Sequence, residues 1–162
     1  MESIINFFNK NFSPELVTVI VATLPVSELR GSIPLAIGEF GFSFQKAYAL
    51  SVMGNLIPVL PILLFLEYLS EKLIKRYNFA QRFFGWLFQR TTRRSKIIET
   101  YGVAGLVLFV SIPLPMTGAW TGCVAAFLFG IRKRWALLGI TCGVLIAGLV
   151  VGSVSEGVIK II

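Results

Sequence analysis

The chain has 162 residues, of which 56% are hydrophobic and only 14% charged, and its mean hydropathy is +0.80. This composition lies outside the range of soluble globular domains and predicts an all-α integral membrane protein, with one membrane domain over residues 1–162. Histidine is absent and both cysteines fall in apolar segments, so we expect neither a metal site nor another cofactor.

The first apolar block, residues 14–38, is broken near its middle by Pro25, Gly31 and Pro34. Each unbroken limb would form a helix about 15 Å long, which is half the thickness of a bilayer. The second block, residues 46–66, is uninterrupted and would be about 31 Å long, enough to cross the membrane. The sequence therefore predicts two half-length limbs followed by one spanning helix.

Residues 67–100 mix basic and aromatic side chains, and eight of the fifteen Lys and Arg residues lie between Lys72 and Lys96. This pattern favours an amphipathic connector that lies on the membrane, anchored by Trp86, over a nucleic-acid-binding patch. We therefore expect membrane lipids as partners of this segment and no nucleic acid.

The third apolar block, residues 102–129, is interrupted by SIPLPMTGAWTG, whereas the fourth, residues 135–155, is long enough to span. The basic cluster Arg132–Arg134 lies between them. Positive residues collect on the cytoplasmic side, so this cluster and Lys72–Lys96 should share that side. This requires the third block to enter and leave the membrane by one face, as a re-entrant hairpin. The first block is interpreted likewise, with the connector cytoplasmic and both termini outside.

The two halves of the chain repeat. FGFSFQKAYALSVMGN, residues 40–55, aligns without a gap to FGIRKRWALLGITCGV, residues 129–144. Each unit, about 12–66 and about 101–156, is then a re-entrant helical hairpin followed by a transmembrane helix. Because one unit crosses the membrane once, the second must be inverted relative to the first, as in many secondary transporters.

The stretch LPVSELRGSIPLAIG places Glu28 and Arg30 inside the first hairpin. A charge near the bilayer centre costs about 2.5 to 3.5 kcal/mol on insertion scales, so such residues need a compensating partner or a function. The prolines and glycine around them predict extended backbone, in which the two side chains share a side and partly neutralise each other. The alternative is a buried ion pair that only fixes the hairpin.

The returning limbs of the two hairpins are expected to begin near Ser32 and Thr117, which suit helix N-caps. Two helix N-termini would then point at the membrane centre and, with Arg30, form a site for an anionic group. Pro34 would leave a backbone carbonyl free, because proline has no amide hydrogen. Asn55 lies in a spanning helix that contains prolines, where it either lines a cavity or packs against the hairpin. Trp120 lies beside the tip of the second hairpin and is either a gate or a filler of space. By this reasoning the remaining candidates are Asn55, Pro113, Pro115 and Trp120.

Four motifs together resemble the small multi-drug export protein family of prokaryotic membrane proteins: LPVSELRGSIPLAIG, GNLIPVLPILLFLE, FVSIPLPMTGAWTGC and ITCGVLIAG. The resemblance implies the prokaryotic inner membrane. It also implies similarity to the DedA superfamily, with re-entrant hairpins, inverted repeats and translocation of polyprenyl phosphate or phospholipid. By position, Glu28 and Arg30 match the acidic and basic residues of the first hairpin. The second hairpin lacks the arginine of the DedA pattern.

These observations predict a DedA-like secondary transporter or lipid translocase that moves an anionic or amphipathic substrate, either a lipid phosphate or a drug-like molecule. Glu28 would couple transport to a proton or a sodium ion, and Arg30 would bind the substrate. The alternative is a non-transporting structural or assembly factor of the membrane. We expect no enzyme, because the sequence offers no catalytic set, and we expect a homodimer that buries the remaining polar backbone.

Overall fold

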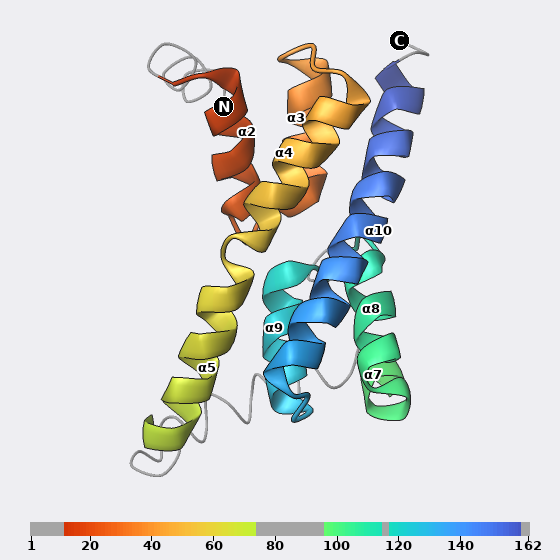
Figure 1. Ribbon diagram of the computed structural model, residues 1–162. Coiled ribbons are helices and arrows are strands. Elements are labelled where there is room, and N and C mark those ends of the chain that lie inside the picture. The colour runs from red at the N-terminus through yellow and green to blue at the C-terminus, as the bar shows by residue number, and fades with distance from the viewer. Residues whose placement is uncertain (1–11, 74–95, 115–116, 160–162) are drawn as a thin grey trace. The chain divides into compact units, whose positions relative to one another are not determined.

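The computed structural model describes residues 12–73, 96–114 and 117–159, and the elements in this part of the chain are all helices (Figure 1). Two segments are long and apolar enough to cross a membrane, Phe44–Tyr68 and Lys133–Val158. They coincide with the two uninterrupted apolar blocks of the sequence, so the predicted all-helical class and both candidate spans are confirmed. Most of the predicted amphipathic connector lies outside the described residues.

The chain divides into two compact units. The first contains Met1–Ile57 and Leu145–Ile162, and the second contains Pro58–Val144. Each unit includes a pair of short helices joined by a turn and a part of each long apolar segment. The division therefore falls within the long segments, near their middles, and does not follow the repeat predicted from the sequence.

The described helices of the first unit are α2 (Pro14–Thr23), α3 (Glu28–Gly38), α4 (Phe44–Leu56) and the C-terminal half of α10 (Lys133–Ile159). α2 begins where a serine and a proline favour a helix start. The hydroxyl oxygen of the N-cap Ser13 accepts a hydrogen bond from the Leu16 amide at 3.4 Å, and Pro14 occupies the first helical position.

The break expected in the first apolar block is present but short. It is confined to residues 24–27, and both Gly31 and Pro34 lie inside α3. Pro34 removes one helical amide donor, so the Arg30 carbonyl lacks its usual partner, but the helix continues. Tertiary contacts with α2 and α4 hold α3 together across this missing hydrogen bond.

α2 and α4 run in the same direction. At one end, Lys46 Nζ lies 2.6 Å from Glu15 Oε1, and this hydrogen bond lowers the pKa of Glu15. Towards the other end, Gly54 lies so close to α2 that a Cβ added there would be 2.6 Å from the Val19 carbonyl oxygen. α3 packs against both helices. It runs in the opposite direction to them and leads the chain from the end near Gly54 back to the end near Lys46.

The described helices of the second unit are α5 (Val59–Leu73), α7 (Lys96–Tyr101), α8 (Val103–Ser111), α9 (Ala119–Leu128) and the N-terminal half of α10. α9 packs against α5 and α8. α10 approaches α8 closely, because a Cβ added to Gly143 would lie 2.6 Å from the Val110 Cβ. Lys133 Nζ lies 2.7 Å from Glu67 Oε2 and joins the start of α10 to α5.

Corresponding positions of the two aligned segments have matching local structure. The glycine before each long helix has a left-handed backbone, with φ of +63° at Gly41 and +64° at Gly130. Further along, Gly54 lies close to α2 and Gly143 lies close to α8, which are the first helices of the pairs α2–α3 and α8–α9. The aligned alanine between them is fully buried in both segments. The match in sequence is thus accompanied by a match in contacts.

Candidate functional site

The turn between α2 and α3 places a glutamate in an unusual backbone conformation. Ser27 Oγ donates to the Val21 carbonyl at 2.8 Å, and α3 begins without a side-chain cap. Glu28 then opens α3 with φ of +44°, and within the described chain it is the one non-glycine residue with positive φ. Such residues cost about 1 to 3 kcal/mol and cluster at functional sites. Glu28 is also buried, with 5% of its surface exposed.

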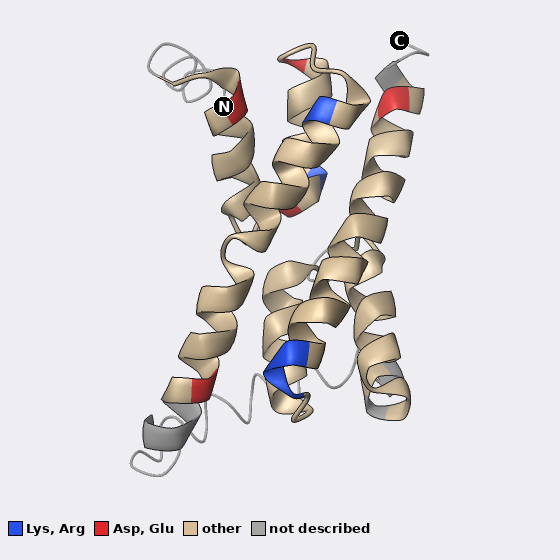
Figure 2. Cartoon of the chain, in the orientation of Figure 1, with Lys and Arg blue, Asp and Glu red and all other residues tan. Residues whose placement is uncertain are grey.

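The backbone around Glu28 and Arg30 differs from the prediction. The sequence predicts extended backbone with both side chains on one side, but both residues lie in α3, near its start (Figure 2). Residues two apart on a helix point in directions about 200° apart. The half-buried Arg30 therefore lies on a different face from Glu28, and the salt bridges between described residues do not include Arg30.

Of the two predicted helix starts, the one near Thr117 is close, because α9 begins at Ala119, whereas the one near Ser32 is wrong, because α3 begins at Glu28. Ser32 lies in the interior of α3, and the N-cap of α9 is Gly118, with φ of +140° and no side-chain cap. Thr117 instead stabilises the turn before α9. Its hydroxyl oxygen lies 2.8 Å from the Leu114 carbonyl and accepts a hydrogen bond from the Leu114 amide at 3.0 Å. The Thr117 hydroxyl is thus used within its own turn.

Four polar residues are buried on α3 and α4, which pack against each other. Glu28 and Ser32 lie one turn apart on α3, and Ser51 and Asn55 lie one turn apart on α4, so each pair shares a helix face. The last three are almost completely buried. Within the described structure, Ser32 Oγ, Ser51 Oγ and Asn55 Oδ1 have no hydrogen-bond partner. We call these four residues the α3–α4 polar cluster.

The directions of the α4 side chains show what the cluster faces. Gly54 packs against α2. Tyr48 faces α10, because its ring would lie 2.8 Å from a Cβ added to Gly148 of that helix. Successive side chains on a helix are rotated by about 100°. The Ser51 and Asn55 side chains therefore point between the direction of Gly54, towards α2, and the direction of Tyr48, towards α10. Figure 1 shows α3 behind α4 in this interval. The two side chains therefore point towards α3.

The cluster lies about halfway along a candidate span. Asn55 is the twelfth of the 25 residues of the segment Phe44–Tyr68, so it lies near the middle of that segment in sequence. Because α2 and α4 run in the same direction, the turn after α2 brings Glu28 to the level of Asn55. The two serines lie one turn nearer the start of α4. A carboxyl group, two hydroxyl groups and an amide are thus gathered near the middle of the span.

Buried oxygen atoms without a partner are costly, at about 1 to 3 kcal/mol for each group. Carboxylate, hydroxyl and amide oxygens are also the donors that hard cations prefer. In the described chain, groups of three His, Cys, Asp or Glu that suit a transition metal are absent. The chemistry of the α3–α4 polar cluster therefore suits a proton, a small hard cation or ordered water.

The other predicted residues lie apart from this cluster in the sequence. Three belong to the turn between α8 and α9 or to the start of α9 in the second unit: Pro113, Thr117 and the half-buried Trp120. Pro115 lies outside the described residues. Ser51 is a member that sequence reasoning missed, although its place one turn before Asn55 in an apolar span is the signal that would identify it.

The sequence matches a family model described as "Putative small multi-drug export protein" over residues 28–150. The chain belongs to this family. The match begins at Glu28 and includes the whole α3–α4 polar cluster, and it confirms the resemblance carried by the four motifs. The family description and the two apolar spans together place the protein in a membrane. Searches of curated proteins and of solved structures give no match.

Proposed function

We propose that this family member is a small secondary transporter of the cell membrane, which moves an anionic or amphipathic molecule in exchange for a proton or a sodium ion. The family description supports export across a membrane. The observation that carries the coupling is the α3–α4 polar cluster, which contains the buried Glu28 and three buried neutral oxygens that have no hydrogen-bond partner among the described residues.

Glu28 is the member of the cluster that changes charge. An ionised carboxylate near the bilayer centre is costly, so it favours binding of a proton or a cation. Ser32, Ser51 and Asn55 supply the oxygen atoms that complete the shell of such an ion. The empty and occupied cluster then differ by one charge. This difference gives the ion a means to favour one conformation of the transporter over another.

Arg30 is the residue we assign to the substrate. It is half-buried near the start of α3 and lies on a different helix face from Glu28, so a bound substrate need not displace the coupling ion. A guanidinium group binds carboxylate and phosphate groups through paired hydrogen bonds. The substrate class is therefore an anionic amphiphile, either drug-like or a lipid phosphate.

We also propose that α2–α3 and α8–α9 are re-entrant hairpins of an inverted repeat. Their helices contain 10, 11, 9 and 10 residues, so each is about 15 Å long and too short to cross a bilayer. The matching contacts of the aligned segments support a repeat. A repeat whose unit crosses the membrane once places its second copy in the opposite orientation.

Cysteine labelling tests this topology. In a variant with Cys123 and Cys142 replaced by alanine, single cysteines at Ser13, Glu39 and Glu156 should react with an impermeant thiol reagent added outside the cell. A cysteine at Arg132 should react only after the membrane is permeabilised, since the basic clusters face the cytoplasm. Labelling at Ser13 and protection at Glu39 would show that α2 and α3 do not form a re-entrant hairpin.

Transport itself is tested with the purified chain in liposomes. A panel of fluorescent anionic and cationic amphiphiles, together with a labelled lipid phosphate, is offered under an imposed pH or sodium gradient. We expect movement of at least one anionic compound that stops when the gradient is dissipated. If every compound moves no faster than in empty liposomes, the protein is a structural or assembly factor instead.

A further inference from the structure

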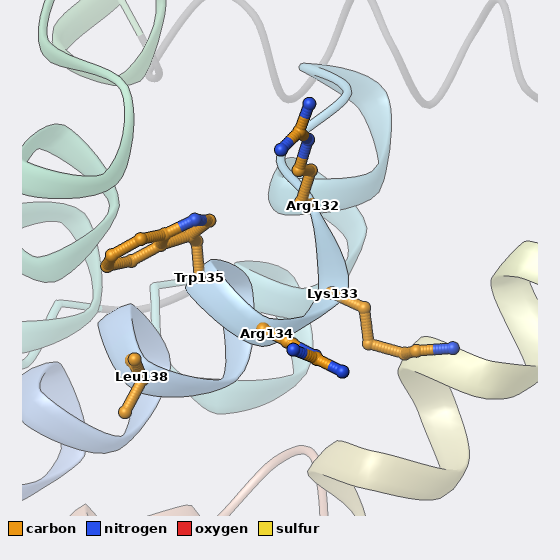
Figure 3. A pocket seen from close by; sticks show the side chains of 5 residues that line it. All are labelled: Arg132, Lys133, Arg134, Trp135 and Leu138. Atoms are coloured by element: carbon orange, nitrogen blue, oxygen red, sulfur yellow. The ribbon is translucent and has the colours of Figure 1, made fainter.

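Five residues at the start of α10 line a hollow of about 540 Å³: Arg132, Lys133, Arg134, Trp135 and Leu138 (Figure 3). In Figure 3 the Lys133 side chain extends away towards the neighbouring helix, where its Nζ lies 2.7 Å from Glu67 Oε2. The two arginines have no salt bridge to an acidic residue in the described part of the chain. The hollow therefore keeps the positive charge of two guanidinium groups.

The hollow also has an apolar side. Trp135 and Leu138 are three residues apart on α10, so they lie on neighbouring parts of one helix face. They are 55% and 56% exposed, so two neighbouring large apolar side chains are presented at this surface. The candidate span begins at Lys133, so this face lies where a membrane core meets its headgroup layer. Tryptophan is enriched at that level, and arginine near it attracts anionic lipids.

We propose that the hollow binds the phosphate headgroup of an anionic phospholipid. The guanidinium groups of Arg132 and Arg134 hold the phosphate oxygens, for which their planar donor geometry is suited. Trp135 and Leu138 contact the first part of an acyl chain. A free phosphate or a nucleic acid would leave this apolar side unused. The site is independent of the proposed transport function, because it uses none of the residues of the α3–α4 polar cluster.

The test uses Trp135 as the reporter. In the full chain with Trp86 and Trp120 replaced by phenylalanine, the remaining fluorescence is measured in vesicles that contain brominated phosphatidylglycerol or brominated phosphatidylcholine. We expect stronger quenching by phosphatidylglycerol. The double variant Arg132→Gln/Arg134→Gln should lower this preference roughly tenfold or more, since each basic residue near the surface contributes on the order of 1 kcal/mol. The control Lys46→Gln removes a basic residue outside the hollow and should keep the preference.

Three results would overturn the proposal: equal quenching by the two lipids in the parent, an unchanged preference in the double variant, or displacement of the lipid by millimolar inorganic phosphate. The last result would identify a site for free anions. If the double variant does not fold, native mass spectrometry of the unaltered chain with the two lipids gives the answer. Retention of phosphatidylglycerol over phosphatidylcholine is expected, and equal retention contradicts the proposal.

Discussion

Replacing Glu28 by glutamine is expected to abolish the response of transport to a proton or sodium gradient while the fold is kept. Glutamine has the shape of a protonated carboxyl group and the same backbone strain at φ of +44°, so the variant isolates the charge. Gradient-driven uptake should fall to the rate of exchange without a gradient. The free energy of unfolding should change by less than about 1 kcal/mol, because the cluster is left in its neutral form. Uptake in liposomes and thermal unfolding measure the two effects.

Arg30 provides the control for this variant. If Glu28 and Arg30 only stabilise the hairpin by their opposite charges, loss of one partner should cost on the order of 3 to 5 kcal/mol, and the double variant Glu28→Gln/Arg30→Gln should recover much of it. In our account the single variant Arg30→Gln folds but loses substrate binding. A double variant that is as stable as the parent and transports normally under every gradient would rule out both assigned roles.

The double variant Ser32→Ala/Ser51→Ala is expected to be more stable than the parent and yet uncoupled. Each substitution removes a buried hydroxyl group that has no hydrogen-bond partner in the described structure, which should stabilise the fold by about 1 to 3 kcal/mol. The same substitutions remove two of the oxygen atoms proposed to surround the coupling ion. Thermal unfolding should therefore shift upwards while the gradient dependence of uptake is lost.

Ser155→Ala is the matched control for the serine pair. Ser155 is also a buried serine of the first unit, but its Oγ donates to the Val151 carbonyl at 2.8 Å. Removal of this satisfied hydroxyl should bring no gain in stability and no change in coupling. If the double variant were destabilised, or if it transported normally under a gradient, the serines would be ordinary packing residues of the α3–α4 contact.

The spans and the breaks in the chain could be predicted from the sequence, because hydropathy and helix length act on whole segments. The local backbone could not. Gly31 and Pro34 are residue types that disfavour helices, yet both lie inside α3. Packing against the neighbouring helices compensates for the stability lost with the one hydrogen bond that Pro34 cannot donate. The true turn lies at residues 24–27. Because the turn ends a few residues earlier than predicted, Glu28 and Arg30 are both helical, and their side chains lie on different faces of α3.

The site was predicted in part. The charge of Glu28 and the polarity of Asn55 stand out in apolar segments, and both belong to the α3–α4 polar cluster. Ser51 does not stand out, because serine is common in membrane helices and its burial depends on which helix packs against α4. Ser32 was predicted for another reason, as a helix cap. That three of these oxygens have no hydrogen-bond partner in the described part of the chain is a property of the packed helices, so periodicity alone does not reveal it.

The central claim is that Glu28 binds the coupling ion, and infrared difference spectroscopy of the protein in lipid tests it most directly. Spectra of the parent minus Glu28→Gln are recorded while the pH is lowered, with and without sodium. We predict a carboxyl C=O band that appears on acidification, or a carboxylate band that shifts on addition of sodium, and neither should occur in the variant. A difference spectrum that responds to neither pH nor sodium would contradict the account.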